Sequence, residues 1–232
     1  MCVRCVPDGA TNGREAKMSS TSCIVLDYGI GNVFSVLHAL EACGTKATLS
    51  RDRAEILAAD RIILPGVGAF GRAADRLRDL GLDETIHEFI RTERPFLGIC
   101  VGMQLLMDVG YEFGEHRGLG VIGGTVEKIA FTDSDGRPVR VPLIGWYPLV
   151  AGDPIAQRGS AILSDDISQE AYYFVHSYET KPSDATTILA QVDHGTHQVV
   201  AAVRKDNVHG IQFHPERSSR TGLDLLGSFL SA

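Results

Sequence analysis

Residues 23–100 alternate short β-rich runs with stretches whose apolar residues recur at helical spacing, and no other feature constrains the fold as much. The β-rich runs read CIVLDY, KATLS, RIILP and PFLGI. Helical spacing follows the first run, and an Asp52-x-x-Glu55 helix-start signal follows the second. Parallel neighbouring strands need a crossover connection, which is usually a helix. The alternation therefore predicts an α/β fold, with an open, mostly parallel, twisted sheet and helices on both faces.

From about Val121 the pattern changes to strand-like segments that lie close together. They read TVEKIAF, YYFVHSYE, TTILAQV, QVVAAVRK and VHGIQF. Turn-forming SDG, DHG and KDN separate some of them, so we expect antiparallel strand additions in the C-terminal half. A last helix closes the chain, with one apolar face formed by Leu223, Leu226, Phe229 and Leu230.

Length and composition predict one domain, because 232 residues with 44% hydrophobic content can bury a full core. We assign residues 23–232 to it. Residues 1–22 carry charges but no apolar signal-peptide segment, so we expect a disordered tail. The net charge of −7, with scattered Lys and Arg, argues against a nucleic-acid surface. The apolar runs are far shorter than the roughly 20 residues that cross a membrane, so no span is expected.

Cysteines and glycines suggest no cofactor. Five cysteines are odd in number and sparse for this length, which favours a reducing, cytoplasmic compartment. Cys2 and Cys5 form a lone CxxC, but a zinc site needs a second ligand pair, so we predict no metal. Three glycine-rich stretches fail to meet the full dinucleotide-binding pattern of strand, helix and later acidic residue. They read GVGAFG, GLGVIG and GIGNVF.

The fourth β-rich run ends in Gly98-Ile99-Cys100-Val101-Gly102, the nucleophile-elbow pattern G-x-S-x-G with sulfur in place of oxygen. A nucleophile on a sharp strand-to-helix turn needs small residues two positions before and after it. Such a turn exposes the thiol at the carboxyl edge of the sheet, where the positive end of a helix favours the thiolate. The alternative is a buried cysteine at a tight turn.

A cysteine nucleophile needs a base, and His214 is the best candidate among eight histidines. It ends the apolar strand in GIQFHPERS, with Glu216 two residues later. In extended backbone such residues point to one side, so Glu216 can orient one imidazole nitrogen while the other faces the thiol. Cys100, His214 and Glu216 therefore form a predicted catalytic triad. Without the elbow motif, His214 and Glu216 would be interpreted as an ordinary ion pair on the protein surface.

The loop in ILPGVGAF ends the strand that precedes the nucleophile strand. Its Gly-Val-Gly sequence frees backbone N–H groups at the carboxyl edge of the sheet. We expect the N–H groups of Val67, Gly68 and Val101 to form an oxyanion hole for the charge on an attacked carbonyl oxygen. The alternative is a plain turn.

These motifs together resemble the class I (triad) glutamine amidotransferases. LDYGIGNVFSVLHAL, LPGVGAFGRA, FLGICVGMQLL, YYFVHSYE and GIQFHPERS are most similar to the glutaminase subunits of imidazole glycerol phosphate synthases, which serve histidine biosynthesis. The resemblance runs from about Ile24 to the end. It implies that Cys100 attacks the side-chain amide of L-glutamine, that His214 protonates the departing ammonia, and that Glu216 orients the histidine.

The resemblance also implies a substrate site and a partner. The implied substrate-contact residues are Gly66, Gly102, Gln104, Glu112, His176, Ser177 and Tyr178. The implied partner is a β/α-barrel cyclase subunit, which forms a heterodimer and receives ammonia through a shielded passage. There the cyclase makes imidazole glycerol phosphate and an aminoimidazole carboxamide ribotide. The PGVG loop is expected to turn away until the partner is loaded.

One segment departs from the family pattern. Members usually read His-Met-Gly-Trp-Asn where this chain has Leu143-Ile144-Gly145-Trp146-Tyr147, at the partner face of relatives. A paralogous glutaminase that supplies ammonia to another synthase, such as one for surface-sugar amidation, therefore stays open as an alternative. A stand-alone cysteine hydrolase of the same fold would use the same triad. A non-catalytic binding subunit would not need the triad residues.

Overall fold

The computed structural model describes residues 22–160, 162–163 and 171–232. The expected tail, and with it Cys2 and Cys5, lies outside the described residues except for Ser22. Ser22 belongs with the fold, because its backbone N–H and its hydroxyl both donate to Oδ2 of Asp60, at 2.7 and 3.0 Å.

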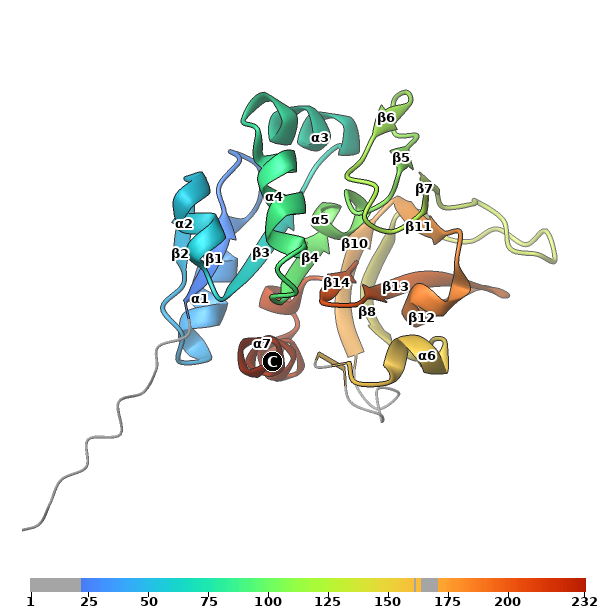
Figure 1. Ribbon diagram of the computed structural model, residues 1–232. Helices are drawn as coiled ribbons and strands as arrows, with labels where there is room; N and C mark the ends of the chain where they lie inside the picture. The colour runs from blue at the N-terminus through green and yellow to red at the C-terminus, as the bar shows by residue number, and fades with distance from the viewer. Residues whose placement is uncertain (1–21, 161, 164–170) are drawn as a thin grey trace, which may run out of the picture.

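An eight-stranded sheet with the order β2-β1-β3-β4-β14-β13-β12-β9 runs through the molecule (Figure 1). The strands from β2 to β14 in this order pair in parallel, and the pairs from β14 to β9 are antiparallel. The parallel strands are β1 (Cys23–Leu26), β2 (Thr48–Ser50), β3 (Arg61–Gly66), β4 (Phe96–Cys100) and β14 (Val208–Ile211). The antiparallel additions are β9 (Val150–Ala151), β12 (Ile188–His194) and β13 (His197–Lys205). The predicted α/β sheet is confirmed.

Helices cover both faces of the parallel half, as the alternation predicts. They are α1 (Val33–Ala42), α2 (Arg53–Ala58), α3 (Phe70–Asp79), α4 (Leu82–Ile90), α5 (Val101–Gln104) and α7 (Ser219–Ser231). The short helix α6 (Pro154–Gln157) packs instead against β12 and β13 of the antiparallel half. α1 and α7 contact each other on one face, and α2, α3 and α4 pack together on the other (Figure 1). The apolar face predicted for the last helix is buried at Leu226 and Phe229.

The boundaries of the helices have local causes. Asp52 caps α2, because its carboxylate accepts a hydrogen bond from the backbone N–H of Glu55 at 3.0 Å, as the start signal predicts. The helical pattern between residues 70 and 90 divides into two helices at Gly81, whose φ of 63° is left-handed. Glycine adopts this conformation without the steric penalty of a side chain.

Two smaller sheets depart from the expected additions to the main sheet. One has the order β11-β7-β5-β6, and the other pairs β10 with β8. Their strands are β5 (Val109–Gly110), β6 (His116–Arg117), β7 (Gly124–Lys128), β8 (Leu143–Pro148), β10 (Ala171–His176) and β11 (Tyr178–Pro182). The segment YYFVHSYE is therefore split at Ser177, because β10 and β11 join different sheets.

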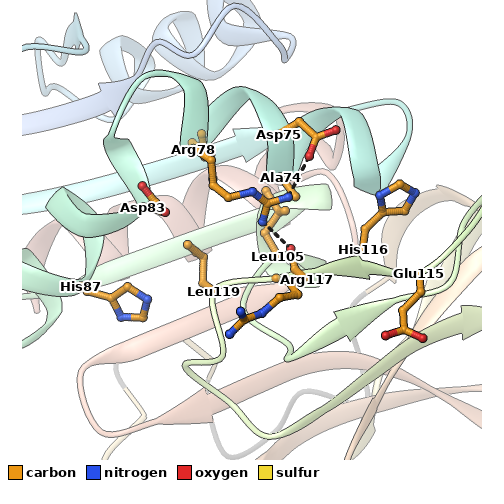
Figure 2. Close-up of a pocket in the computed structure, with 12 residues that line it drawn as sticks. Ala74, Asp75, Arg78, Asp83, His87, Leu105, Glu115, His116, Arg117 and Leu119 are labelled. Atoms are coloured by element: carbon orange, nitrogen blue, oxygen red, sulfur yellow. Dashed lines mark hydrogen bonds and ion pairs between the residues drawn. The ribbon is translucent and has the colours of Figure 1, made fainter.

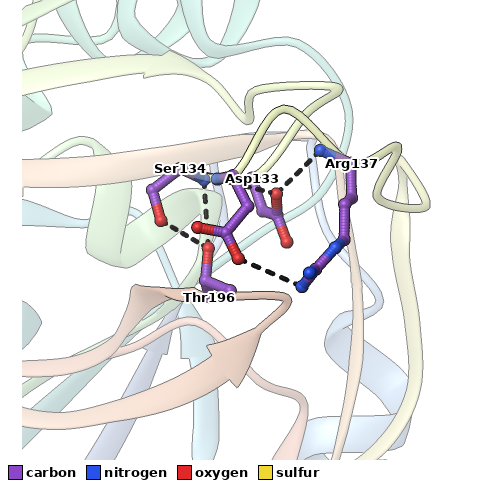
Figure 3. A network of polar contacts seen from close by, with 5 residues as sticks. Asp133, Ser134, Arg137 and Thr196 are labelled. Carbon is purple, nitrogen blue, oxygen red and sulfur yellow. Dashed lines mark hydrogen bonds and ion pairs between the residues drawn. The ribbon is translucent and has the colours of Figure 1, made fainter.

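A polar network fastens the connection between β7 and β8 to the turn between β12 and β13 (Figure 3). Ser134 donates its backbone N–H to Oγ1 of Thr196 at 3.1 Å, and the two hydroxyls lie 2.5 Å apart. Asp133 accepts the backbone N–H of Arg137 at 2.9 Å within the same connection. Pro142, at the end of the same connection, lines the cavity beside Cys100.

Candidate active site

Cys100 ends β4 and lies immediately before α5, in a backbone conformation with φ 55° and ψ −111°. A positive φ is uncommon for a residue with a side chain and is a form of stored strain. A Cβ atom added at Gly98 would lie 2.6 Å from the carbonyl oxygen of Gly102. One added at Gly102 would lie 1.9 Å from the carbonyl oxygen of Leu64. The turn thus has the geometry of a nucleophile elbow, and it closes only around glycine at these two positions.

His214 and Glu216 form a buried pair beside this elbow. β14 pairs in parallel with β4, with Ile211 opposite Ile99, so the residues that follow β14 reach the elbow. Nδ1 of His214 lies 2.9 Å from Oε1 of Glu216, and the two side chains are 6% and 2% exposed. This contact leaves Nε2 of the imidazole for Cys100. The structure therefore brings the three predicted triad residues together.

The imidazole of His214 carries a proton at neutral pH. Burial alone lowers its pKa, but hydrogen bonds to Cys100 and Glu216, together with their negative charges, outweigh burial and raise the pKa to about 10. A protonated imidazole beside the sulfur favours the thiolate, which is the nucleophilic form of cysteine.

The reason given from sequence for the His214–Glu216 contact is wrong. Residues Pro215–Arg217 form a 3-10 turn and not extended backbone. Ser218 holds this turn: its hydroxyl donates to the carbonyl oxygen of His214 at 2.7 Å and accepts the N–H of Tyr173 at 3.0 Å. Sequence reasoning missed Ser218, which in sequence is one of two adjacent serines at the start of the last helix and carries no signal of this contact.

The PGVG loop begins next to the elbow, because Gly66 pairs with Cys100 across β3 and β4. The hydroxyl of Tyr28 donates to the carbonyl oxygen of Pro65 at 2.7 Å and secures the start of the loop. Among the described residues, none accepts a hydrogen bond from the backbone N–H of Val67 or Gly68. Val101 is the first residue of α5, where an N–H has no acceptor within the helix. Val67, Gly68 and Val101 line the same cavity as Cys100.

A cavity of about 520 Å³ opens at Cys100, and most of the predicted site residues line it. The lining includes Val67, Gly68, Cys100, Val101, Gln104, Glu112, His176, Ser177, Tyr178, His214 and Glu216. Gly66 and Gly102 are not among the residues that line it. They lie beneath the elbow, where a Cβ at Gly66 would stand 2.7 Å from the backbone nitrogen of Gly102. Their role is to permit close backbone packing.

The residues expected to contact substrate are held by defined hydrogen bonds. Nε2 of Gln104 donates to the carbonyl oxygen of Tyr178 at 3.1 Å, and Oε2 of Glu112 accepts the N–H of Phe70 at 2.7 Å. Nδ1 of His176 lies 2.8 Å from the carbonyl oxygen of Tyr178. Burial lowers the pKa of His176 to about 4, so this imidazole is neutral at pH 7.

A second cavity, of about 490 Å³, lies between α3, α4 and β6 (Figure 2). Arg78 crosses it, paired with Asp75 at 2.8 Å and donating to the carbonyl oxygen of Arg117 at 2.9 Å. None of the predicted site residues lines it. Within the described ranges, no group of three or more His, Cys, Asp or Glu side chains is placed to hold a metal ion. No described helix is long and apolar enough to span a membrane.

Comparison with known proteins finds a family whose members match this chain over nearly its whole length. Residues 24–230 match the family model for glutamine amidotransferase class-I. The chain is 43% identical over 208 residues to the imidazole glycerol phosphate synthase subunit HisH of Salinibacter ruber, covering 88% of this chain and 92% of that protein. It is 39% identical over 213 residues to subunit HisH 1 of Legionella pneumophila, covering 92% and 99%.

Two further matches extend the comparison. The chloroplastic imidazole glycerol phosphate synthase hisHF of Arabidopsis thaliana is 43% identical over 219 residues, which cover 94% of this chain and 35% of that protein. The solved structure of PurLQS from Thermotoga maritima has a TM-score of 0.68 at 18% identity, covers 91% of this chain and 98% of its own, and shares the fold. The chain therefore belongs to the class I glutamine amidotransferase family, in its group of imidazole glycerol phosphate synthase HisH subunits.

Proposed function

We propose that this chain hydrolyses L-glutamine to glutamate and ammonia and passes the ammonia to the cyclase subunit of an imidazole glycerol phosphate synthase in histidine biosynthesis. One observation carries the chemistry. Cys100 lies in a strained elbow beside a buried His214–Glu216 pair, at the wall of a cavity large enough for an amino acid. We place this reaction in the cytoplasm, as the sparse cysteines suggest.

The first half of the reaction forms a thioester. The Cys100 thiolate attacks the side-chain amide carbon of glutamine, and the carbonyl electron pair moves onto oxygen. The N–H groups of Val67, Gly68 and Val101 stabilise that oxyanion, each donor contributing about 3 kcal/mol. His214 then gives its proton to the amide nitrogen. The carbon–nitrogen bond breaks and ammonia leaves.

The second half releases glutamate. His214 is now neutral and takes a proton from water as the water oxygen attacks the thioester carbon. The carbon–sulfur bond breaks, glutamate departs, and the thiolate and protonated imidazole are restored. Glu216 stabilises the imidazolium that starts and ends the cycle.

Glutamine carries an ammonium and a carboxylate at its α-carbon, and the cavity supplies groups for both. Glu112 offers a carboxylate on one wall, while Gln104 and the His176-Ser177-Tyr178 segment offer amide, hydroxyl and backbone groups on another. We assign these residues to seating the α-groups. Because His176 is neutral, it adds no positive charge that would repel the ammonium.

The proposed cyclase docks at the mouth of this cavity. Phe113, at 86% exposed, lines the cavity together with Val175. Ile144, at 38% exposed, pairs with Val175 across β8 and β10, and Trp146, at 50% exposed, lies two residues further along β8. Burying such side chains against a partner is favourable by about 25 cal/mol per Å². This chain corresponds to 35% of the Arabidopsis hisHF protein, whose remaining length leaves room for a second subunit.

The segment that departs from the family pattern keeps its tryptophan outward. Leu143 is buried, and Tyr147 packs edge-on against Phe174 with ring centroids 6.0 Å apart. Trp146 contacts Tyr173 at 6.0 Å while staying half exposed. Both replacements thus turn into the protein and leave an aromatic docking face, which supports the proposed partner over a stand-alone hydrolase.

Replacement of the nucleophile tests the proposal. In the complex with the cyclase, Cys100→Ser should abolish glutamine-dependent synthesis, while ammonium salts still support it because the cyclase is untouched. Glutamine-dependent activity in that variant would end the proposal. The subunit assayed alone should be slow, and full turnover without a partner would favour the stand-alone hydrolase.

A second experiment locates the reactive thiol. A glutamine-mimicking diazo-ketone amino acid should label Cys100 and neither Cys23 nor Cys43. Burial raises the pKa of Cys23 to about 12 and also raises that of Cys43, so both stay protonated thiols at neutral pH. Mass spectrometry that found the label on either of them would contradict the assignment.

A further inference from the structure

Gln212 contacts both the sulfur of Cys100 and a wall of the cavity. It lies just beyond β14, two residues before His214, and is fully buried. Its Nε2 donates toward Sγ of Cys100 at 3.6 Å, and its Oε1 accepts from Nε2 of Gln104 at 3.0 Å. Its backbone N–H donates to the carbonyl oxygen of Ala201 at 2.8 Å, which fixes its place beside the sheet.

The orientation of the Gln212 amide follows from its neighbours. The carbonyl oxygen of Tyr178 can only accept, so Gln104 must turn its NH₂ group toward it. The same NH₂ group faces Gln212, which must therefore present its oxygen to Gln104. The NH₂ group of Gln212 is left to face the sulfur. The directional chain runs from Tyr178 through Gln104 and Gln212 to Cys100, and each link uses a donor and an acceptor.

We infer that Gln212 is a positioning residue for the nucleophile, which holds the sulfur of Cys100 in place and couples it to the substrate-seating residue Gln104. This inference rests on the proposed glutaminase function. A buried N–H donor stabilises a thiolate more than a neutral thiol, because hydrogen bonds to ionised groups are the stronger ones. The Cys100 thiolate attacks glutamine in the first half of the reaction and is the leaving group when the thioester breaks in the second half. The NH₂ group of Gln212 therefore acts on the sulfur in both halves.

Two substitutions separate the two hydrogen bonds of Gln212. Gln212→Glu has the same shape and keeps an acceptor for Gln104, but it replaces the donor to sulfur with a carboxylate oxygen. Gln212→Met is close in volume and removes both hydrogen bonds. Gln198→Met is the matched control, because Gln198 lies on β13 away from the cavity and bonds Asp193 at 3.0 Å.

Each variant is assayed as the full chain with its cyclase partner. We expect kcat for glutamine to fall about tenfold or more in both Gln212 variants. The KM for glutamine should stay near the parent value in Gln212→Glu and rise in Gln212→Met, because only the latter frees Gln104. Iodoacetamide should alkylate Cys100 about tenfold more slowly in Gln212→Glu, which reports on the sulfur without substrate or partner. Gln198→Met should match the parent throughout.

A merely structural role for Gln212 would give a different result. A folded Gln212→Glu variant with the parent kcat and the parent alkylation rate would overturn the inference, and thermal unfolding shows whether each variant is folded. If Gln212→Met does not fold, Gln212→Glu decides alone. A parent complex that fails to consume glutamine would refute the proposed function, and this inference with it. A parent that works while both variants work equally well would refute this inference alone.

Discussion

Nδ1 of His214 lies 2.9 Å from a carboxylate oxygen of Glu216 across a single turn of 3-10 helix. The carboxylate is almost completely buried, so its negative charge acts on the imidazole with little screening by water. The contact fixes the orientation of the ring and, with Cys100, raises the pKa of the imidazole.

Glu216→Gln should therefore lower glutamine-dependent kcat by about 10- to 100-fold, because the amide can still accept a hydrogen bond but has no charge to stabilise the imidazolium. Ammonium-dependent synthesis by the complex should be unchanged. Steady-state assays with both nitrogen sources check this. Equal losses with glutamine and with ammonium would instead indicate a damaged complex.

Ser218→Ala should destabilise the fold by about 1 to 3 kcal/mol, because it leaves the N–H of Tyr173 and a carbonyl oxygen of His214 without their buried partner. Ser228→Ala is the control, since that exposed hydroxyl bonds only the carbonyl oxygen of Asp224 on the surface of α7. Urea unfolding should show a change within about 0.5 kcal/mol for the control. Equal stability of the two variants would show that Ser218 does not hold the turn.

Gly102→Ala should cost about 3 kcal/mol of stability, because its methyl group would meet the carbonyl oxygen of Leu64 at 1.9 Å and backbone must move. Gly227→Ala provides the opposite case, since a Cβ there meets nothing within 4 Å and the residue lies inside α7. That substitution should add about 0.5 to 1 kcal/mol. Thermal unfolding of both variants checks the contrast, and a stabilised Gly102→Ala variant would contradict the elbow geometry.

Protonation of His209 should make the fold less stable in acid. Burial, followed by the charge of Arg204, lowers the pKa of His209 from 6.5 to about 4. The unfolded chain therefore takes up a proton at this position between pH 6.5 and pH 4 that the folded chain does not, so stability falls as the pH drops through this window. At the lower end of this pH window, the loss of folding stability that is due to His209 reaches about 3 kcal/mol.

His209→Leu should reduce this loss, because both ring nitrogens of His209 lack a partner among the described residues and a leucine has no proton to take up. The slope will not vanish, since buried His176 has the same sign of dependence. Urea unfolding at several pH values between 7 and 4.5 measures the slope, with His38→Leu on the exposed side of α1 as control. A His209→Leu variant with the parent slope would contradict the prediction.

Local patterns made the parallel sheet, the covering helices and the elbow predictable. The alternation of strands and helices forces parallel pairing, and two glycines around a cysteine at a strand end leave few alternatives. The division of residues 171–182 between two sheets was not predictable, because an alternating pattern shows which face is buried but not which strand will be the neighbour.

The spacing of residues in the sequence also could not distinguish residues that line the cavity from residues that lie beneath it. Gly66 and Gly102 share the motifs of the lining residues, yet they serve the backbone packing of the elbow. Gln212 was missed for the opposite reason. In sequence it is one polar residue in an apolar run, and its two hydrogen bonds depend on β4 and β14 being adjacent, which only the folded sheet provides.

The place of β14 in the middle of the sheet determines when a newly made molecule can become active. β14 lies between β4 and β13, although it is synthesised long after β4. Until β14 and the turn that follows it have left the ribosome, the elbow has neither its base nor its carboxylate. A chain whose synthesis has not passed this point therefore lacks the arrangement that the proposed glutaminase reaction needs.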